Sequence, residues 1–213
     1  MRAEPKTTTL KQVAENLDNI LQKRNGGAIN FRGIHFQILY ACYLILQELK
    51  KDAKTKSIRL EGIEDIDLHT SQTITSDSEY IQLKSSVNKM DAGTFWGLGV
   101  LQNFLEVYEK NPDSRFKLVY NMKSADGNFS ALINKRQGQP ISKFWLDKLE
   151  TLSQNTNFSD FVDRISFESQ STNELYARIQ ALLYKEWNIN KGTERQFLNA
   201  LFYNILIWSK NRA

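Results

Sequence analysis

Apolar residues recur along the chain with two different periods, and the change between them predicts the order of its elements. Over Thr7–Lys23 the apolar positions fall every three to four residues, which is typical of an amphipathic helix. The polar segment Arg24–Gly27 ends it and indicates a glycine hinge. A second helix is predicted over Asn30–Lys51, where apolar residues cover nearly every side, as in a helix buried in a core. Gln37 is a polar exception inside it.

From Ser57 onward the period changes to two residues, which predicts strands. The predicted strands are Ile58–Glu61, Asp65–His69 and Tyr80–Lys84, followed by a helix over Ala92–Lys110, a buried strand over Phe116–Tyr120 and a polar loop over Lys123–Gly138. The predicted order is therefore helix, three strands, helix, strand, which makes the chain an α/β protein.

The region after Pro140 is predicted to be mainly helical. Its expected elements are helices over Ser142–Thr151, Glu174–Trp187 and Glu194–Lys210, with one extended piece at Arg164–Phe167. We therefore divide the chain into an N-terminal helix and hinge (residues 1–29), a core (30–139) and a helical extension (140–213). The last helix is rich in large apolar side chains, so it is expected to pack on this core, on a second copy or on a following domain.

Composition indicates which partners and which cellular compartment suit the protein. The formal charge of +4 is mildly favourable for a polyanionic partner. A single cysteine, Cys42, excludes an internal disulfide framework and is compatible with a reducing cytoplasm. The N-terminus lacks the apolar run of a secretory signal, and no stretch reaches the roughly 20 apolar residues of a membrane span. We expect a cytoplasmic protein without membrane contact.

The strand pattern gathers polar side chains on one face of the sheet. Alternate residues of a strand share a face, so Asp65, Asp67 and His69 lie together. Gln82 and Lys84 likewise share a face with Tyr80. If residues 70–79 turn the chain in a symmetric hairpin, Asp67 lies beside Lys84 and His69 beside Gln82.

These residue types fit the hydrolysis of a phosphodiester. The Asp67 carboxylate, the Gln82 side-chain oxygen and the backbone carbonyl of Leu83 are oxygen ligands that could hold Mg²⁺ or Mn²⁺. Lys84 could orient the attacking water and stabilise negative charge in the transition state. The sequence therefore predicts a metal-dependent hydrolase site.

The element order and three motifs resemble the PD-(D/E)XK nuclease superfamily. Gly33–Gln37 is similar to the G-x-x-[FY]-[EQ] helix motif of Mrr-like restriction endonucleases, Gly62–Leu68 to the acidic second strand, and Gln82–Lys84 to the QxK form of the signature. The resemblance adds Gln37 to the catalytic residues Asp67, Gln82 and Lys84. Asp65 and Glu64 compete with Asp67 for the metal. Asp67 is preferred because an aspartate followed by an aliphatic residue in mid-strand fits the Mrr-like pattern.

Within that superfamily the chain resembles the double-stranded DNA endonuclease domain of CD-NTase-associated SAVED effectors, which also occurs in STAND-type antiphage ATPases. The resemblance implies a restriction-endonuclease-like core with helical additions at both ends. It also implies cutting of double-stranded DNA in bacterial anti-phage defence, activated by homo-oligomerisation or by a C-terminal sensor or ATPase module lying outside these 213 residues.

Other residues and functions stay open at this stage. His35 is a possible accessory residue but favours a structural role, and nothing assigns catalysis to His69. Phosphate contacts to DNA are possible for five basic residues: Arg32, Lys89, Lys123, Lys135 and Arg136. The alternatives to a nuclease are a catalytically inactive module of the same fold that binds nucleic acid, and an assembly domain driven by the helices after Pro140.

Overall fold

A five-stranded sheet lies at the centre of the described part of the chain, which in this computed structural model comprises residues 32–49, 57–60, 65–69, 78–154 and 156–210. The strands are β1 (Ser57–Leu60), β2 (Ile66–His69), β3 (Ser78–Ser85), β4 (Arg115–Asn121) and β5 (Ile165–Ser169), and they lie side by side in chain order. The pairs β1/β2 and β2/β3 are antiparallel, whereas β3/β4 and β4/β5 are parallel. Strands β3, β4 and β5 therefore end at the same edge of the sheet.

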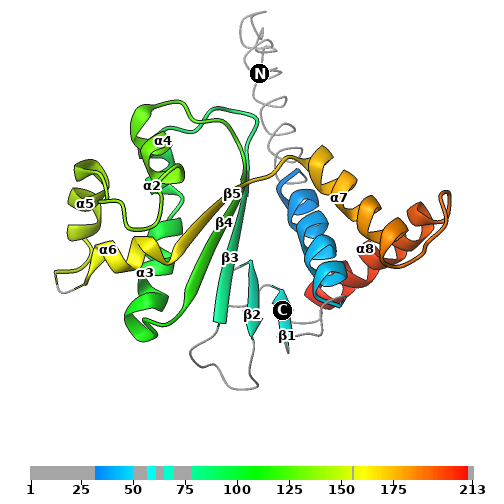
Figure 1. Cartoon of the computed structure of the whole chain (residues 1–213). Helices are drawn as coiled ribbons and strands as arrows, with labels where there is room; N and C mark the ends of the chain where they lie inside the picture. The colour runs from blue at the N-terminus through cyan, green and yellow to red at the C-terminus, as the bar shows by residue number, and fades with distance from the viewer. Residues whose placement is uncertain (1–31, 50–56, 61–64, 70–77, 155, 211–213) are drawn as a thin grey trace, which may run out of the picture.

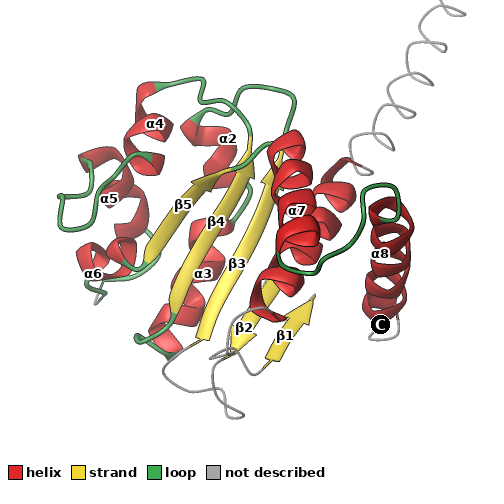
Figure 2. Cartoon of the chain, turned by 45° about the vertical axis from the view of Figure 1, so that its right-hand side comes forward, coloured by secondary structure: helices red, strands yellow, loops and turns green. Residues whose placement is uncertain are grey.

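Helices cover both faces of the sheet (Figure 1, Figure 2). One face carries α2 (Ala92–Gly97), α3 (Val100–Lys110), α4 (Gly127–Ile133), α5 (Lys143–Glu150) and α6 (Phe158–Asp163). The other face carries the helix of residues 32–49 together with α7 (Thr172–Lys185) and α8 (Glu194–Lys210). None of the helices within the described residues is long and apolar enough to cross a membrane.

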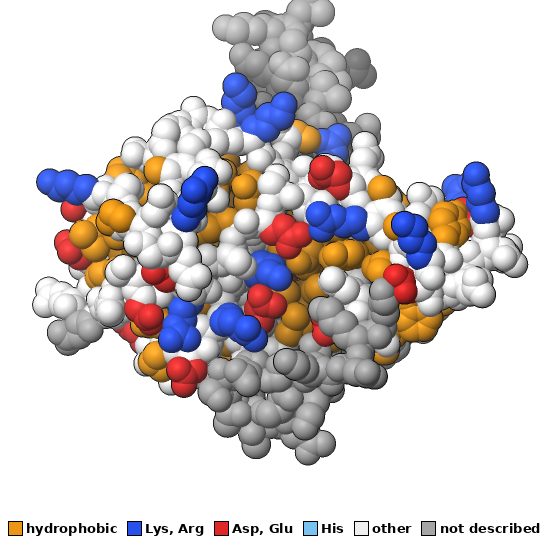
Figure 3. All heavy atoms as spheres, in the orientation of Figure 1, with side chains coloured by type: hydrophobic (Ala, Val, Ile, Leu, Met, Phe, Trp, Pro, Cys, Tyr) orange, Lys and Arg blue, Asp and Glu red, His pale blue; other side chains and the backbone are white. Residues whose placement is uncertain are grey.

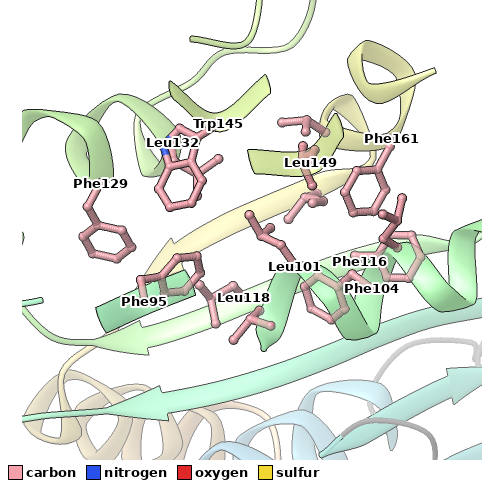
Figure 4. Close-up of a cluster of buried hydrophobic side chains, with 14 of the residues drawn as sticks. Phe95, Leu101, Phe104, Phe116, Leu118, Phe129, Leu132, Trp145, Leu149 and Phe161 are labelled. Carbon is pink, nitrogen blue, oxygen red and sulfur yellow. The ribbon is translucent and has the colours of Figure 1, made fainter. Parts of the chain in front are cut away.

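Each face has its own hydrophobic core. On the first face, aromatic and aliphatic side chains of the helices pack on strands β3 and β4, with Phe104 against Phe116 and Phe95 against Phe129 (Figure 4). On the second face, the helix of residues 32–49 and α7 bury their apolar side chains against the other side of the same strands. Alternation along β3 explains the separation, because neighbouring residues point to opposite faces.

The expected restriction-endonuclease-like order is confirmed, from the helix of residues 32–49 through β1, β2 and β3 to the helical pair α2 and α3 and then β4. The helix expected over Ala92–Lys110 is divided in two. Gly99 interrupts it with a φ of 73°, in the left-handed region that glycine adopts without a steric penalty. The predicted N-terminal helix of residues 7–23 and its hinge lie outside the described residues.

Two short helices were not expected from the sequence. Helix α4 lies within the predicted polar loop of residues 123–138 and begins after Asp126, whose side chain accepts a hydrogen bond from the backbone N–H of Phe129. Burial of Phe129 and Leu132, three residues apart, holds it on the sheet. Helix α6 begins at Phe158 in the same way, after Asn157, and buries Phe158, Phe161 and Val162.

The region after Pro140 is part of this fold. The extended piece expected near Arg164–Phe167 is strand β5, which extends the sheet beside β4. Helix α5 buries Trp145 and Leu149 in the first core, and α7 buries Leu175 and Ile179 in the second. The expected helices over Ser142–Thr151, Glu174–Trp187 and Glu194–Lys210 correspond to α5, α7 and α8. This region thus adds a strand as well as helices to the core.

Candidate active site

The pairing of β2 with β3 differs from the symmetric hairpin expected from the sequence. Asp67 lies opposite Tyr80, and His69 lies opposite Ser78, so neither is beside Lys84 or Gln82. Strand β3 begins at Ser78, two residues before the expected start, and the connection from β2 is correspondingly shorter. The shift along β3 is even, from Lys84 to Tyr80, so every side chain keeps its expected face.

With this register, Asp65 takes the place beside Gln82 that His69 was expected to take. Ile66 pairs with Ile81, so one step further along the ladder Asp65 is level with Gln82. A hydrogen bond fixes the contact, since the backbone N–H of Leu83 donates to Asp65 Oδ2 over 2.7 Å. Asp65 lies just before β2, and its side chain continues the pairing where the strand itself has not yet begun.

The Gln82 side chain carries an unsatisfied oxygen. Gln82 is 6% exposed, and its Oε1 is buried without a hydrogen-bond partner among the described residues. Buried polar atoms normally have a partner, and one without it calls for an explanation such as an absent ion or water. The amide oxygen, one residue before the Leu83 N–H that Asp65 binds, is thus a candidate oxygen ligand for a hard cation.

The Leu83 backbone completes this set of oxygens. In an extended strand the N–H and C=O of one residue point to the same side, so the carbonyl of Leu83 points toward Asp65, as its N–H does. Three oxygen donors from Asp65, Gln82 and Leu83 suit Mg²⁺ or Mn²⁺. Among the described residues no three His, Cys, Asp or Glu side chains cluster to hold a metal, so an ion here depends on amide and backbone oxygens as well as on carboxylate.

Lys84 lies two residues beyond Gln82 on the same strand and on the same face. Its neighbour on β4 is Tyr120, close to the end of that strand. Lys84 is half-buried, so its ammonium group is close to solvent at the edge of the sheet. This position suits a side chain that must reach a substrate bound outside the strand ends.

Asp67, the expected main ligand, lies deeper in the sheet. It is 0% exposed and lies between Arg59 of β1 and Tyr80 of β3 in the ladder. Burial raises the pKa of the Tyr80 phenol, and the nearby Asp67 carboxylate adds to that rise. His69 lies further from the site, with its Nδ1 2.9 Å from Ser78 Oγ and its ring edge-on to Tyr80.

The remaining expected site residues lie on the helix of residues 32–49 or outside the described residues. Gln37 is half-buried on the helix of residues 32–49, which packs on the opposite face of the sheet from Gln82. His35 Nε2 is 3.1 Å from the hydroxyl oxygen of Tyr176 on α7, and the His35 ring contacts Phe202 of α8 edge-on. These contacts give His35 a structural role in packing the three helices together. Glu64 lies outside the described residues.

Three of the five basic residues lie near the edge where β3 and β4 end. Arg32 lines a small hollow with residues 85–88, the segment that follows Lys84. Lys89 and Lys123 are exposed and belong to neighbouring loops, joined by the hydrogen bond from Met90 N–H to the Lys123 carbonyl over 2.8 Å. Lys and Arg side chains gather over this end of the sheet in Figure 3.

Lys135 and Arg136 lie elsewhere. They line a hollow together with Glu79 and Arg115, near the starts of β3 and β4 and therefore at the far end of the strands from Lys84. The Lys135 side chain is 6% exposed and forms an ion pair with Asp163. Its hydrogen bond lowers the pKa of the Asp163 carboxyl. The structure thus does not bring these two residues to the candidate active site.

The order of elements and the polar end of β3 place the chain in the class of restriction-endonuclease-like α/β domains. A family model described as the Cap4 dsDNA endonuclease domain matches residues 25–200, and the chain belongs to this family. A comparison with curated proteins gave no match.

Two solved structures show the same fold, both of the Cap4 SAVED/CARF-domain containing receptor from Acinetobacter baumannii. One holds the cyclic trinucleotide 2'3'3'-cAAA and is 17% identical with a TM-score of 0.52; the other holds 3'3'3'-cAAA and is 16% identical with a TM-score of 0.51. Each comparison covers 83% of this chain but only 41% or 43% of the receptor. The chain therefore spans less than half the length of these relatives.

Proposed function

We propose that this chain is a Mg²⁺- or Mn²⁺-dependent endonuclease domain that cuts double-stranded DNA. The observation that carries the proposal is the group of oxygen donors around the end of β3: the Asp65 carboxylate held at the Leu83 N–H, and the buried Gln82 Oε1 without a partner among the described residues. Membership of the Cap4 dsDNA endonuclease family supports the substrate class.

In this proposal Asp65, Gln82 and the Leu83 carbonyl hold the metal. Asp65 replaces Asp67 as the leading carboxylate because the observed register puts Asp65, and not Asp67, beside Gln82. A bound Mg²⁺ or Mn²⁺ would polarise the scissile phosphoryl group and make a water nucleophilic at neutral pH. Asp67, two residues further along the same face, supports the site from the interior.

Lys84 acts on the reacting groups. Its ammonium donates hydrogen bonds to the attacking water and to a phosphoryl oxygen, which orients the first and stabilises charge that grows on the second. Its half-buried position strengthens these interactions, because charges attract more strongly where water is partly excluded. Gln37, which the resemblance places among the catalytic residues, lies on the helix of residues 32–49 and is proposed as a residue that supports the site.

The DNA lies along the edge formed by Arg32, Lys89 and Lys123 in this proposal. Contacts of lysine and arginine with phosphates carry affinity without reading sequence. All three residues surround the end of β3, so they would place the phosphodiester backbone next to Lys84.

We further propose that the domain is an effector of anti-phage defence that acts when it is oligomerised or recruited, because an unregulated nuclease would attack host DNA. The relatives of known structure are receptors of which the match to this chain covers only 41% and 43%, with cyclic trinucleotides bound. Exposed Phe197 and Tyr203 on α8 are apolar side chains that such an assembly could cover.

The test is cleavage of a supercoiled plasmid by the chain alone and by the chain fused to a C-terminal dimeric coiled coil. We expect cleavage with Mg²⁺ or Mn²⁺, none with EDTA, and none for Asp65→Ala or Lys84→Ala. Asp113→Ala and Lys110→Ala, exposed residues at the other end of the sheet, are the matched controls and should cut normally. Cleavage that survives Lys84→Ala contradicts the mechanism. DNA binding without cleavage in both forms selects the inactive binding module instead.

A further inference from the structure

A second hollow, of about 570 Å³, lies at the end of the sheet opposite to Lys84. Its lining comes from the starts of β3, β4 and β5, the end of α6 and the segment after α4. Glu79 and Arg115 mark its position near the starts of β3 and β4. A volume of this size is within the range of about 300–1,000 Å³ for small-molecule sites.

The acidic residues of this hollow are already neutralised. Each carboxylate has a basic partner: Glu79 with Lys117 at 3.5 Å, Asp160 with Arg164 at 3.3 Å, and Asp163 with Lys135. Asp160 also accepts a hydrogen bond from the Tyr108 hydroxyl over 2.6 Å. None of the three therefore offers an uncompensated negative charge to a ligand.

Two arginines of the lining are not among these ion pairs. Arg115 and Arg136 are exposed, and within the described residues neither has a carboxylate partner. Glu79, the neighbour of Arg115 across the β3/β4 ladder, is engaged by Lys117. The hollow thus presents two guanidinium groups whose charge no described carboxylate balances.

Guanidinium groups favour phosphate, because their planar fork matches two phosphate oxygens. A free phosphate ion would fill only a small part of about 570 Å³. The rest of the lining includes residues with apolar side chains, among them the half-buried Ile133 and Phe167. This combination fits a ligand with an organic ring as well as a phosphate.

We propose that this hollow is a second binding site, for a phosphate-bearing organic molecule of nucleotide size held by Arg115 and Arg136. It is separate from the nuclease site, because Glu79 and Lys84 are five residues apart on β3, roughly 16 Å at the rise of a strand. A ligand there would leave Gln82 and Lys84 accessible. The proposal does not depend on nuclease activity.

The experiment is calorimetric titration of the intact chain with adenosine 5′-monophosphate in EDTA, which removes metal from the nuclease site. Inorganic phosphate, adenosine and a short DNA duplex are titrated in parallel. The variants are Arg115→Ala, Arg136→Ala, the milder Arg115→Gln and Arg136→Gln, and Lys84→Ala. Lys148→Ala, a cation next to Trp96 and absent from this lining, is the matched control. Thermal melting checks that each variant is folded.

We expect the monophosphate to bind, and each arginine substitution to weaken it about tenfold or more, the loss for one charged hydrogen-bonding group. Lys84→Ala and Lys148→Ala should bind as the unmodified chain does, while adenosine should not bind. The proposal is overturned if the monophosphate does not bind at millimolar concentration, or if the arginine variants bind it unchanged. It is also overturned if free phosphate or the duplex binds as tightly with the same dependence on these arginines, since the hollow is then a simple anion or DNA contact.

Discussion

Asp65 accepts a hydrogen bond from the backbone N–H of Leu83 over 2.7 Å, and this contact brings its carboxylate to the residue that follows Gln82, whose side-chain oxygen is buried. The hydrogen bond thus joins the residue just before β2 to the middle residue of the QxK motif on β3. Asp67, within β2, is fully buried between Arg59 and Tyr80. This arrangement gives the two aspartates different roles, which can be separated by substitution.

Asp65→Asn should abolish metal-dependent cleavage while leaving the fold stable. The amide keeps the size of the carboxylate but removes the charge, so cleavage should fall roughly 100-fold or more with the loss of several kcal/mol of transition-state stabilisation. Asp67→Asn should instead lower the free energy of unfolding by about 1–3 kcal/mol, since it changes a buried charged group. Plasmid cleavage and thermal melting measure the two effects. The reverse result, an active Asp65→Asn and an inactive but stable Asp67→Asn, contradicts the assignment.

Lys84→Met should separate binding from cleavage. The substitution keeps a long side chain but removes the ammonium, so cleavage should fall by about 100-fold or more, as for the loss of a donor that stabilises transition-state charge. Affinity for a DNA duplex should change little, because phosphate contacts at the edge supply it. Single-turnover cleavage and fluorescence anisotropy measure the two quantities. A variant that loses affinity and keeps its maximal rate would show that Lys84 only binds DNA.

The three basic residues at the active-site edge should set the salt dependence of DNA binding. Replacing Arg32, Lys89 and Lys123 by alanine should reduce the slope of log K against log salt by about 0.9 for each phosphate that the protein no longer neutralises. Arg136→Ala, which removes a positive charge at the other end of the strands, is the control and should leave the slope unchanged. Equal effects at Arg32 and Arg136 would mean that DNA does not follow this edge.

Gly99→Ala should destabilise the protein through backbone strain alone. Gly99 has a φ of 73° between α2 and α3, and a Cβ there would meet only Asn103 Oδ1 at 3.9 Å, so space is not limiting. The expected loss is roughly 1–2 kcal/mol of unfolding free energy. Gly97→Ala is the matched control, because that glycine ends α2 without positive φ and has open space around it. Urea unfolding distinguishes them, and an equal response of the two would exclude strain at Gly99.

Much of this architecture could be predicted from periodicity. The change from a period of three to four residues to a period of two located the first helix and the strands, and alternation placed Gln82 and Lys84 on one face. The prediction that Gln82 and Lys84 share a face was unaffected by the error in register, because the shift along β3, from Lys84 to Tyr80, is an even number of residues. The helices after Pro140 followed from their apolar spacing in the same way.

The register of β2 against β3 was predicted wrongly. It depends on where β3 begins, and Ser78 and Glu79 look like part of a polar loop in the sequence. A buried contact decides it, since Ser78 pairs with His69 deep in the sheet. Alternation does extend back through Ser78, Tyr80 and Gln82, and that signal could have placed Asp65 beside Gln82.

The positions of the basic residues were likewise beyond a linear pattern. Lys123 and Lys135 are close in sequence, but α4 lies between them and carries Lys135 away from the active-site edge. There Asp163 binds it, a contact between residues 28 positions apart. The charge of a loop therefore does not show by itself which basic residues lie near the candidate active site, because that depends on where the fold returns the loop.

The position of manganese in a crystal of the chain soaked with Mn²⁺, located by anomalous diffraction, decides whether the proposed metal site exists. We expect one peak within about 2.2 Å of the side-chain oxygens of Asp65 and Gln82, close to the Leu83 carbonyl, and its loss in Asp65→Asn. A peak held by Asp67 without Asp65, or a chain that binds no manganese there and still cuts DNA, would contradict the proposed site.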